Sequence, residues 1–529
     1  MPLAGLTLDL ERLHAPVPIW HGRIARDDWQ EAAIAVRRAG GRLISIWGSN
    51  RAGERPGDDL RSAATDHVAI CAAYAVSEGL IWLELPLSGR PPTYPDLSAI
   101  FPAGLRMQRA AADLSGLVAE GEQDGRPWLN HGAWPADYFP LRQDESAPPA
   151  WPEAPVTDYP FVRVDGDGVH EIAVGPVHAG IIEPGHFRFS VVGEKVLRLE
   201  ERLGYTHKGI EKRFTQLPPL QAARLAGRVS GDSTVAYAWA YCMALESAAN
   251  CEIPPRARWL RALMLERERV ANHLGDLGAL GNDAALAFGL AQFSRLREDW
   301  LRLSKAVFGH RLMMDGVMPG GVACDVDPPA RDRLLAQCDA IEREVQTLRT
   351  VYEEHAGLQD RFINTGRVNP ALAAQLGLTG LAGRASGQAA DLRCDQPWPP
   401  YDGLQVKMAT HRNGDVAARV TVRFEEVSES LRLMRAILAG LPAGRTCSEV
   451  SLPAQAARGA GWVEGWRGEI LVALELDGAA HPHRIRRCHC HDPSWQNWPV
   501  IEHAVIGNIV PDFPLINKSF NLSYSGHDL

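Results

Sequence analysis

The chain has 529 residues, of which 46% are hydrophobic and 22% charged, a composition typical of a soluble globular protein with a large core and two or more domains. Its net charge of -9 and sequence pI of about 6.1 argue against non-specific nucleic-acid binding. No apolar run reaches the roughly 18–20 residues of a membrane span, and the N-terminus lacks a signal-peptide pattern. We therefore expect reduced cysteines and, if the protein works at a membrane, docking onto other subunits.

The first 145 residues have the pattern of a small α/β domain. Short β-rich runs at 43–47, 67–74 and 79–85 are bounded by polar or glycine-rich turns, and this spacing predicts a meander. A helical segment ending near residue 116 follows. A proline-rich connector sets a natural boundary, so we expect a first domain at 1–145, a linker at 146–158 and a second domain at 159–529.

The second domain begins with strand patterns and continues as a mainly helical region. Residues 162–174 and 187–197 are predicted strands, joined by a hairpin rich in proline and glycine. Apolar residues recur with helical spacing in four later stretches, which predicts a packed bundle: 258–280, 286–313, 327–356 and 419–440. The expected fold class is α+β, with a small α/β domain followed by a large, mainly helical domain that starts with a β-hairpin.

The stretch 228–246 is the first candidate site. It opens with serine, glycine and aspartate, which favour turns and helix caps, and then becomes nearly uncharged, as in a helix buried in a large core. This arrangement predicts that the hydroxyls of Ser230 and Ser233 and one carboxylate lie at a deep site.

The same stretch resembles the Arg-x-Cys-Gly-x-Cys motif of nickel–iron hydrogenase large subunits. The resemblance is strongest to the energy-converting, membrane-associated group (formate hydrogenlyase, hydrogenase-3 and hydrogenase-4 type), which is similar to the quinone-site subunit of complex I. Ser230 and Ser233 stand at the two cysteine positions. Residues 520–529 resemble the second Cys-x-x-Cys motif, with Ser523 and Gly526 at its cysteine positions.

What this resemblance implies is a hydrogenase-like scaffold without its metal. Nickel and iron need soft thiolates, which hydroxyls and glycine do not replace, so the nickel–iron centre is expected to be lost and no metal is predicted. C-terminal processing, which follows metal insertion in hydrogenases, is not expected. Residues 1–145 resemble the complex I subunit that sits beside the quinone-site subunit, so the chain resembles a fusion of the two.

The hairpin at 175–188 carries His178, Glu183 and His186. Chemistry alone leaves a polar hairpin tip and a functional loop about equally plausible. In hydrogenases the glutamate matching Glu183 lies beside the metal and passes protons, and burial would raise the pKa of such a carboxyl. Where complex I has its quinone-facing histidine and tyrosine, this chain has Ile182 and Gly231.

Further family motifs follow in the family order. The resemblance places Arg467 where an arginine overhangs the nickel–iron centre, and places the stretch 384–393 along the same cavity. His207, Glu211 and Lys212 resemble a shared helix motif, for which we expect i,i+4 contacts and a structural role. The implied catalytic residues are Glu183, Arg467 and Asp391, and the implied cavity-lining residues are His178, His186, His207, Ser230, Ser233, Arg384, Arg393 and Ser523.

The run 488–492 places cysteines and histidines together, which suggests a metal site. Its alternation is that of a strand, on which Cys488 and Cys490 point to the face opposite the histidines, so metal binding is disfavoured. The sequence contains no glycine-rich phosphate loop and no Cys-x-x-Cys pair. We expect iron–sulfur clusters, NADH and flavin to belong to partner chains, while a quinone or another small redox substrate remains possible.

Two functional hypotheses remain open. The first is an electron-transfer subunit of a complex I-like or hydrogenase-like oxidoreductase, peripheral on the cytoplasmic face of a membrane, beside a small iron–sulfur subunit and antiporter-like membrane subunits. The second is a noncatalytic scaffold or coupling subunit of such a complex. Retention of Glu183, Asp391 and Arg467 favours the first hypothesis, whereas Ile182, Gly231 and the missing cysteines favour the second.

Overall fold

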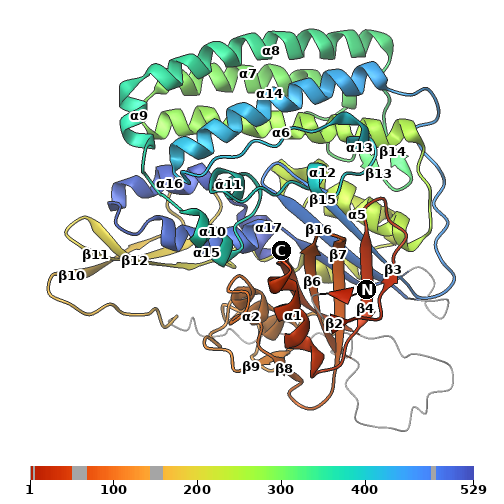
Figure 1. Cartoon of the computed structure of the whole chain (residues 1–529), viewed down its shortest axis with the longest axis vertical. Coiled ribbons are helices and arrows are strands. Elements are labelled where there is room, and N and C mark those ends of the chain that lie inside the picture. The colour runs from red at the N-terminus through yellow and green to blue at the C-terminus, as the bar shows by residue number, and fades with distance from the viewer. Residues whose placement is uncertain (1, 4–5, 51–67, 143–158, 181, 478–483) are drawn as a thin grey trace.

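The computed structural model describes residues 2–3, 6–50, 68–142, 159–180, 182–477 and 484–529. The predicted linker at 146–158 lies outside these residues. A mixed sheet and a bundle of long helices lie on opposite sides of the molecule, and a three-stranded antiparallel sheet projects from its side (Figure 1). The α+β class predicted from the sequence is confirmed.

The N-terminal part is built on a five-stranded sheet of order β3-β4-β7-β6-β5. Strands β5, β6 and β7 form the predicted antiparallel meander, and β4 runs parallel to β7. Helix α2 ends where Gly116 adopts a left-handed conformation, which closes helices at little steric cost. The elements are β1 (Pro2–Leu3), β2 (Leu6–Thr7), β3 (Glu11–Arg12), β4 (Ile19–Arg23), α1 (Asp28–Arg38), β5 (Arg42–Asn50), β6 (Val68–Val76), β7 (Gly79–Leu87), β8 (Thr93–Pro95), α2 (Gly104–Ser115) and β9 (Val118–Glu120).

This sheet is buried on both faces. Along β6, Cys71 and Ala73 pack into the core of the second domain, whereas Ile70, Ala72 and Tyr74 belong to a second core that includes residues of α1 and α2. Because successive side chains of a strand point to opposite faces, one strand contributes to both cores. The fused N-terminal part is thus packed against the rest of the chain.

A three-stranded antiparallel sheet follows: β10 (Val169–Val174), β11 (His186–Val192) and β12 (Lys195–Arg202). The predicted single strand at 187–197 is wrong, because the chain turns at Gly193, which has a positive φ. The predicted strand at 162–174 is restricted to its second half. The sheet projects from the side of the molecule (Figure 1).

The predicted helical bundle is confirmed by α6 (Pro255–Asp283), α7 (Ala287–Phe308), α8 (Pro328–Glu354) and α14 (Val416–Gly440). These helices lie together above the sheets (Figure 1). Shorter elements connect them: α3 (Ile210–Phe214), α4 (Pro219–Ala226), β13 (Val317–Met318), β14 (Gly321–Val322), α9 (Ala356–Phe362), α10 (Pro370–Leu376), α11 (Gly380–Ala385), α12 (Leu392–Asp395) and α13 (Tyr401–Leu404).

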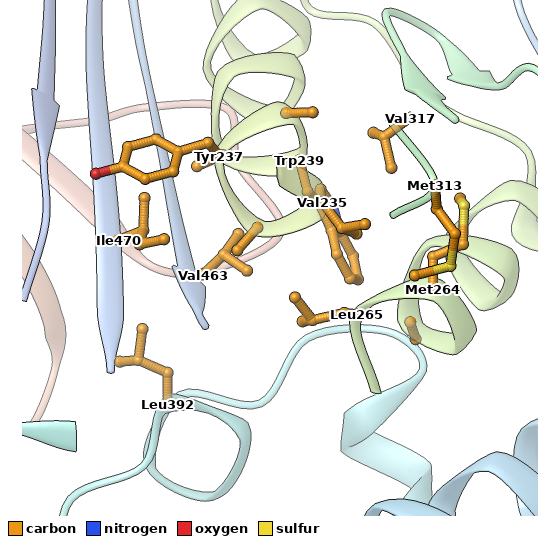
Figure 2. Packing of buried hydrophobic residues seen from close by; sticks show 14 of the residues in the cluster. Val235, Tyr237, Trp239, Met264, Leu265, Met313, Val317, Leu392, Val463 and Ile470 are labelled. Atoms are coloured by element: carbon orange, nitrogen blue, oxygen red, sulfur yellow. The ribbon is translucent and has the colours of Figure 1, made fainter. Parts of the chain in front are cut away.

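Helix α5 (Thr234–Ala248) is the central helix, and every one of its residues is buried. It packs against a sheet of β15 (Ala457–Glu464), β16 (Glu469–Leu476) and β17 (Ile485–His491). The contact is close because a Cβ at Gly461 would lie 1.9 Å from the Ala240 carbonyl oxygen. Figure 2 shows the result: Tyr237 extends toward the strands, while Trp239 packs among side chains that include Leu265.

The chain ends with α15 (Ser494–Ala504), η2 (Val510–Asp512), α16 (Phe513–Phe520) and α17 (Tyr524–Asp528). A short 3-10 helix, η1 (Gly231–Ser233), precedes α5. All nine cysteines are free thiols in the structure, and Cys71, Cys242 and Cys338 are buried as expected. Among the described residues, no helix is both long and apolar enough to cross a membrane.

Candidate functional site

The two motifs that resemble hydrogenase cysteine motifs meet in space, although 293 residues separate them. The Oγ atoms of Ser230, before α5, and Ser523, before α17, lie 2.9 Å apart. Ser230 donates to the Asp232 carboxylate at 2.8 Å, so the Ser523 hydroxyl donates to Ser230. Ser523 in turn accepts from the Gly526 backbone N–H at 2.8 Å. Ser230, Asp232, Ser523 and Gly526 thus form a connected hydrogen-bonded cluster.

The space beside Gly526 is filled by a carboxylate. A Cβ at Gly526 would lie 2.4 Å from the Asp492 Oδ2 atom. Asp492 is 1% exposed, and its carboxylate accepts from the Tyr237 hydroxyl at 2.8 Å and from the Ser494 backbone N–H at 2.9 Å. A cysteine at position 526 therefore requires this held carboxylate to move.

Arg467 closes the cluster from the turn between β15 and β16. Its guanidinium donates to both oxygens of Asp232, with the Nη1–Oδ1 distance at 2.9 Å, and to the Asn521 carbonyl oxygen. It also lies 3.4 Å from the Ser233 Oγ atom. Burial raises the pKa of Asp232, but Arg467 outweighs this and holds it below its usual range. The arrangement is a fixed ion pair beside two linked hydroxyls.

Glu183 reaches this cluster through the C-terminal segment. Its carboxylate accepts from the Ser525 backbone N–H at 3.0 Å, one residue before Gly526. The expected burial of Glu183 is wrong for this chain by itself, because the loop between β10 and β11 leaves the residue exposed. The neighbouring Ile182 is also exposed.

The three candidate histidines do not converge on the cluster. His178 is exposed and lies edge-on to Phe187. His186 is buried, and its Nδ1 lies 3.3 Å from the Gly175 carbonyl oxygen. His207 donates from Nδ1 to the Asp528 carbonyl oxygen at 2.7 Å. They hold the hairpin and the C-terminal segment in place and share no described hydrogen bond with the two serines.

Asp391, Arg384 and Arg393 belong to a buried ionic network beneath the cluster. Arg393 bridges Asp391 at 2.7 Å and Glu266 at 3.1 Å, and all three side chains are at most 2% exposed. Arg384 lies 3.8 Å from Asp391. Burial raises the pKa of Asp391, but Arg393 and Arg384 outweigh it and hold the pKa below its usual range. Asp391 therefore has its two cations within the network.

This network also fixes the turn that carries Arg467. Arg384 donates to Glu464, the last residue of β15, at 2.8 Å, and also contacts Glu426 on α14. Arg269 on α6 donates to the carbonyl oxygens of Glu464 and of the following residue. We infer that Arg384 positions the Arg467 turn.

The predicted i,i+4 contact of His207 with Glu211 is wrong. Glu211 on α3 instead binds Arg487 at 2.9 Å and the His489 Nδ1 atom at 2.7 Å, both on β17. Burial raises the pKa of Glu211, but Arg487 and His489 lower it to about 2. Residues 488–491 of this run lie on β17 as predicted, with Cys488 and Cys490 buried in the core, and Asp492 follows the strand.

Glu268 was missed by the sequence analysis, because nothing local distinguishes it from the other charged residues of α6. Its carboxylate accepts from the backbone N–H groups of Val235 and Ala236 at the start of α5, at 2.6 and 3.2 Å. Burial raises its pKa to about 8, although the two hydrogen bonds from the backbone N–H groups lower it, and the nearby Asp232 adds to the rise. Glu268 is thus a neutral acid at the start of the central helix at pH 7.

We expect Glu268→Gln to flatten the pH dependence of stability. Below about pH 8 the folded state holds a proton that the unfolded state releases near pH 4.5, so stability falls as pH rises through this window. Glutamine does not titrate, so the variant does not lose this stability. Between about pH 5 and about pH 7.5 its free energy of unfolding should therefore rise by about 3 kcal/mol relative to that of wild type. Urea unfolding across this range measures it. Exposed Glu449→Gln is the control, and equal slopes for wild type and Glu268→Gln would contradict the assignment.

Comparisons with known proteins fit this fold. The family described as "Respiratory-chain NADH dehydrogenase, 49 Kd subunit" matches residues 276–458, and the corresponding 30 Kd family matches residues 23–149. Formate hydrogenlyase subunit 5 of Escherichia coli is 31% identical over 89% of this chain and 84% of its own length. The carbon monoxide-induced hydrogenase of Rhodospirillum rubrum is 32% identical over 66% of this chain and 97% of its own length.

A solved structure gives the same architecture. A chain from the structure of the membrane-bound sulfane sulfur reductase, an archaeal respiratory membrane complex, aligns with a TM-score of 0.64 at 24% identity, covering 68% of this chain and 99% of that chain. About two thirds of this chain thus has the fold of nearly the whole of that chain. The chain belongs to the family that unites the 49 kDa subunit of respiratory-chain NADH dehydrogenase with related hydrogenase subunits.

The side chains at the four cysteine positions do not fit a nickel–iron centre. Nickel and iron require soft thiolates, whereas Ser230, Ser233 and Ser523 offer hard, neutral hydroxyls and Gly526 offers none. The hydroxyls of Ser230 and Ser523 already bind each other. Within the described parts of the chain, no group of three or more histidine, cysteine, aspartate or glutamate residues is placed to hold a metal ion.

Proposed function

We propose that this chain is an electron-transfer subunit of a complex I-like or hydrogenase-like oxidoreductase, and that it works without a nickel–iron centre. The observation that carries the proposal is the meeting of Ser230 with Ser523 beneath the Arg467–Asp232 ion pair. In this proposal the cluster occupies the place of the family's metal site, with a hydrogen-bonded polar group in place of the soft ligands.

The chemistry of this cluster suits binding and proton handling. Arg467 presents a fixed guanidinium, and Glu183 presents a carboxylate on the neighbouring loop. The serine hydroxyls can both donate and accept. The proposed substrate is a small redox molecule that is neither dihydrogen nor a quinone held as in complex I, since Ile182 and Gly231 replace the two quinone-facing groups. A quinone held differently remains within this class.

The proposed assembly follows from the relatives. The relatives include subunits of formate hydrogenlyase and of NADH–quinone oxidoreductase. We infer that iron–sulfur clusters lie in a partner, a small iron–sulfur subunit, and that antiporter-like membrane subunits anchor the complex on the cytoplasmic face of the membrane. Such a partner would cover the exposed loop that carries Glu183.

The metal prediction is the direct test. We expect the complex, purified through a tag on this chain, to contain no stoichiometric nickel and to catalyse no exchange between D2 and water protons, because no thiolate is available. Elemental analysis and mass spectrometry of the evolved gas measure these quantities. Iron from partner clusters serves as the internal control for intact assembly. About one nickel per chain would overturn the proposal.

The second candidate function, a noncatalytic scaffold or coupling subunit, is favoured by the saturated hydrogen bonding of Ser230 and Ser523. The two candidates differ in whether the polar cluster affects turnover. Arg467→Lys keeps the charge but loses the forked contact with Asp232, so a working cluster loses activity while a scaffold does not. Copurification of the partners with the variant controls for assembly.

A further inference from the structure

The turn that carries Arg467 has a buried glutamate at each end. Glu464 is the last residue of β15, Glu469 is the first residue of β16, and the two are paired in the antiparallel ladder. Every residue from 464 to 469 is buried. Like charges at opposed positions destabilise a sheet, and a buried carboxylate is costly without a partner, so a nearby cation stabilises each of them.

The two glutamates bind cations from different parts of the chain. Arg384 on α11 binds Glu464 at 2.8 Å. Glu469 instead binds Arg42, the first residue of β5 in the N-terminal sheet. The Glu469 side chain is 3% exposed, and among the described residues Arg42 is the only cation within 4 Å of its carboxylate. The counter-charge at this end of the turn therefore comes from the N-terminal part.

The surroundings of Glu469 leave the turn little freedom to shift. Its carboxylate also accepts from the Thr379 hydroxyl at 3.0 Å and from the Trp462 indole N–H at 3.1 Å. Gly380, the residue after Thr379, packs directly on the turn, because a Cβ there would lie 1.8 Å from the Arg467 carbonyl oxygen. The position of this carboxylate and that of the turn are therefore linked.

Strand β5 is fixed along the sheet of β15, β16 and β17 by further polar contacts. The Ser45 hydroxyl lies 2.7 Å from the His489 Nε2 atom on β17. The Ser49 hydroxyl donates to Glu475, near the far end of β16, at 2.5 Å. Because these contacts anchor the strand, the cation at its first residue extends from a fixed backbone.

We propose that Arg42 is a positioning residue for Arg467. Its cation holds Glu469 at one end of the turn, and the turn places the Arg467 guanidinium beside Asp232. The N-terminal part thus contributes to the geometry of the hydrogen-bonded cluster, although none of the described hydrogen bonds of Arg42 reaches that cluster. The effect on turnover rests on the function proposed above, whereas the effect on the turn does not.

Hydrogen exchange of the full chain, followed by mass spectrometry of its peptides, tests the geometry. Arg42→Met removes the cation, so we expect the backbone amides of 464–469 to exchange about tenfold faster, since the Glu469 carboxylate loses its charged partner. Arg42→Lys keeps a cation and should restore much of the protection. Ser49→Ala is the matched control, because it removes a contact of the same strand at the far end of β16 and should leave the turn unchanged.

Turnover of the complex in membrane vesicles, with reduced methyl viologen as electron donor, tests the connection to Arg467. We expect Arg42→Met to lower turnover about tenfold in the wild-type background. It should have little further effect on the residual turnover of Arg467→Lys, because it acts through that arginine.

Unchanged exchange of 464–469 in Arg42→Met, or equal losses of turnover in the two backgrounds, would overturn the proposal. Full turnover of Arg467→Lys would instead remove the function proposed for the cluster. The exchange rates of Arg42→Met and Ser49→Ala would then decide by themselves whether Arg42 positions the turn.

Discussion

Replacing Arg393 by methionine is expected to lower the free energy of unfolding by about 3–5 kcal/mol. The guanidinium bridges Asp391 and Glu266, and all three groups are nearly inaccessible to water. Methionine fills much of the same volume, but it leaves two carboxylates without their main cation. Each carboxylate keeps a second arginine, which limits the loss of stability. Arg384 lies 3.8 Å from Asp391, and Arg269 lies 3.4 Å from Glu266.

Urea unfolding of the full chain measures this loss. Arg302→Met on α7 is the matched control, since its i,i+4 pair with Glu298 is on the surface and its side chain is 75% exposed. That pair should contribute little to the free energy of unfolding, because water and salt screen exposed charges. A loss for Arg393→Met as small as that of the control would show that the network is not a stability element.

The local pattern of the sequence was sufficient to predict the long helices of the bundle. Apolar residues at helical spacing identified α6, α7, α8 and α14, although α6 is buried all round from Leu260 to Ala271. The nearly uncharged sequence of α5 likewise predicted a buried helix. The turn at Gly193 was missed because apolar residues on both sides of it resemble one continuous strand.

The partners of the buried charges could not be predicted from local pattern. Glu211 and Arg487 are 276 residues apart, and nothing in either segment specifies the other. The meeting of Ser230 with Ser523 was expected only through the resemblance to a family whose two motifs share one site. Asp492 was first considered within a possible metal-binding run, and only the folded chain places it in the space beside Gly526.

The last prediction concerns proton transfer at Glu183. Its carboxylate accepts from the Ser525 N–H, so it lies beside the position where the family has its second cysteine motif. Glu183→Gln keeps an oxygen that can accept this bond but cannot exchange a proton. If Glu183 relays protons for the complex, turnover and proton movement should fall about 10²-fold while assembly is retained.

The measurement uses membrane vesicles that contain the complex, with NADH or reduced methyl viologen as electron donor and pH recorded inside the vesicles. Glu171→Gln on β10 is the matched control, because it removes a carboxylate from the same projecting sheet without touching the C-terminal segment. Copurification of the partner subunits reports assembly. Wild-type rates of electron transfer and proton movement in an assembled Glu183→Gln complex would rule out the relay, and would favour the noncatalytic scaffold over the electron-transfer subunit.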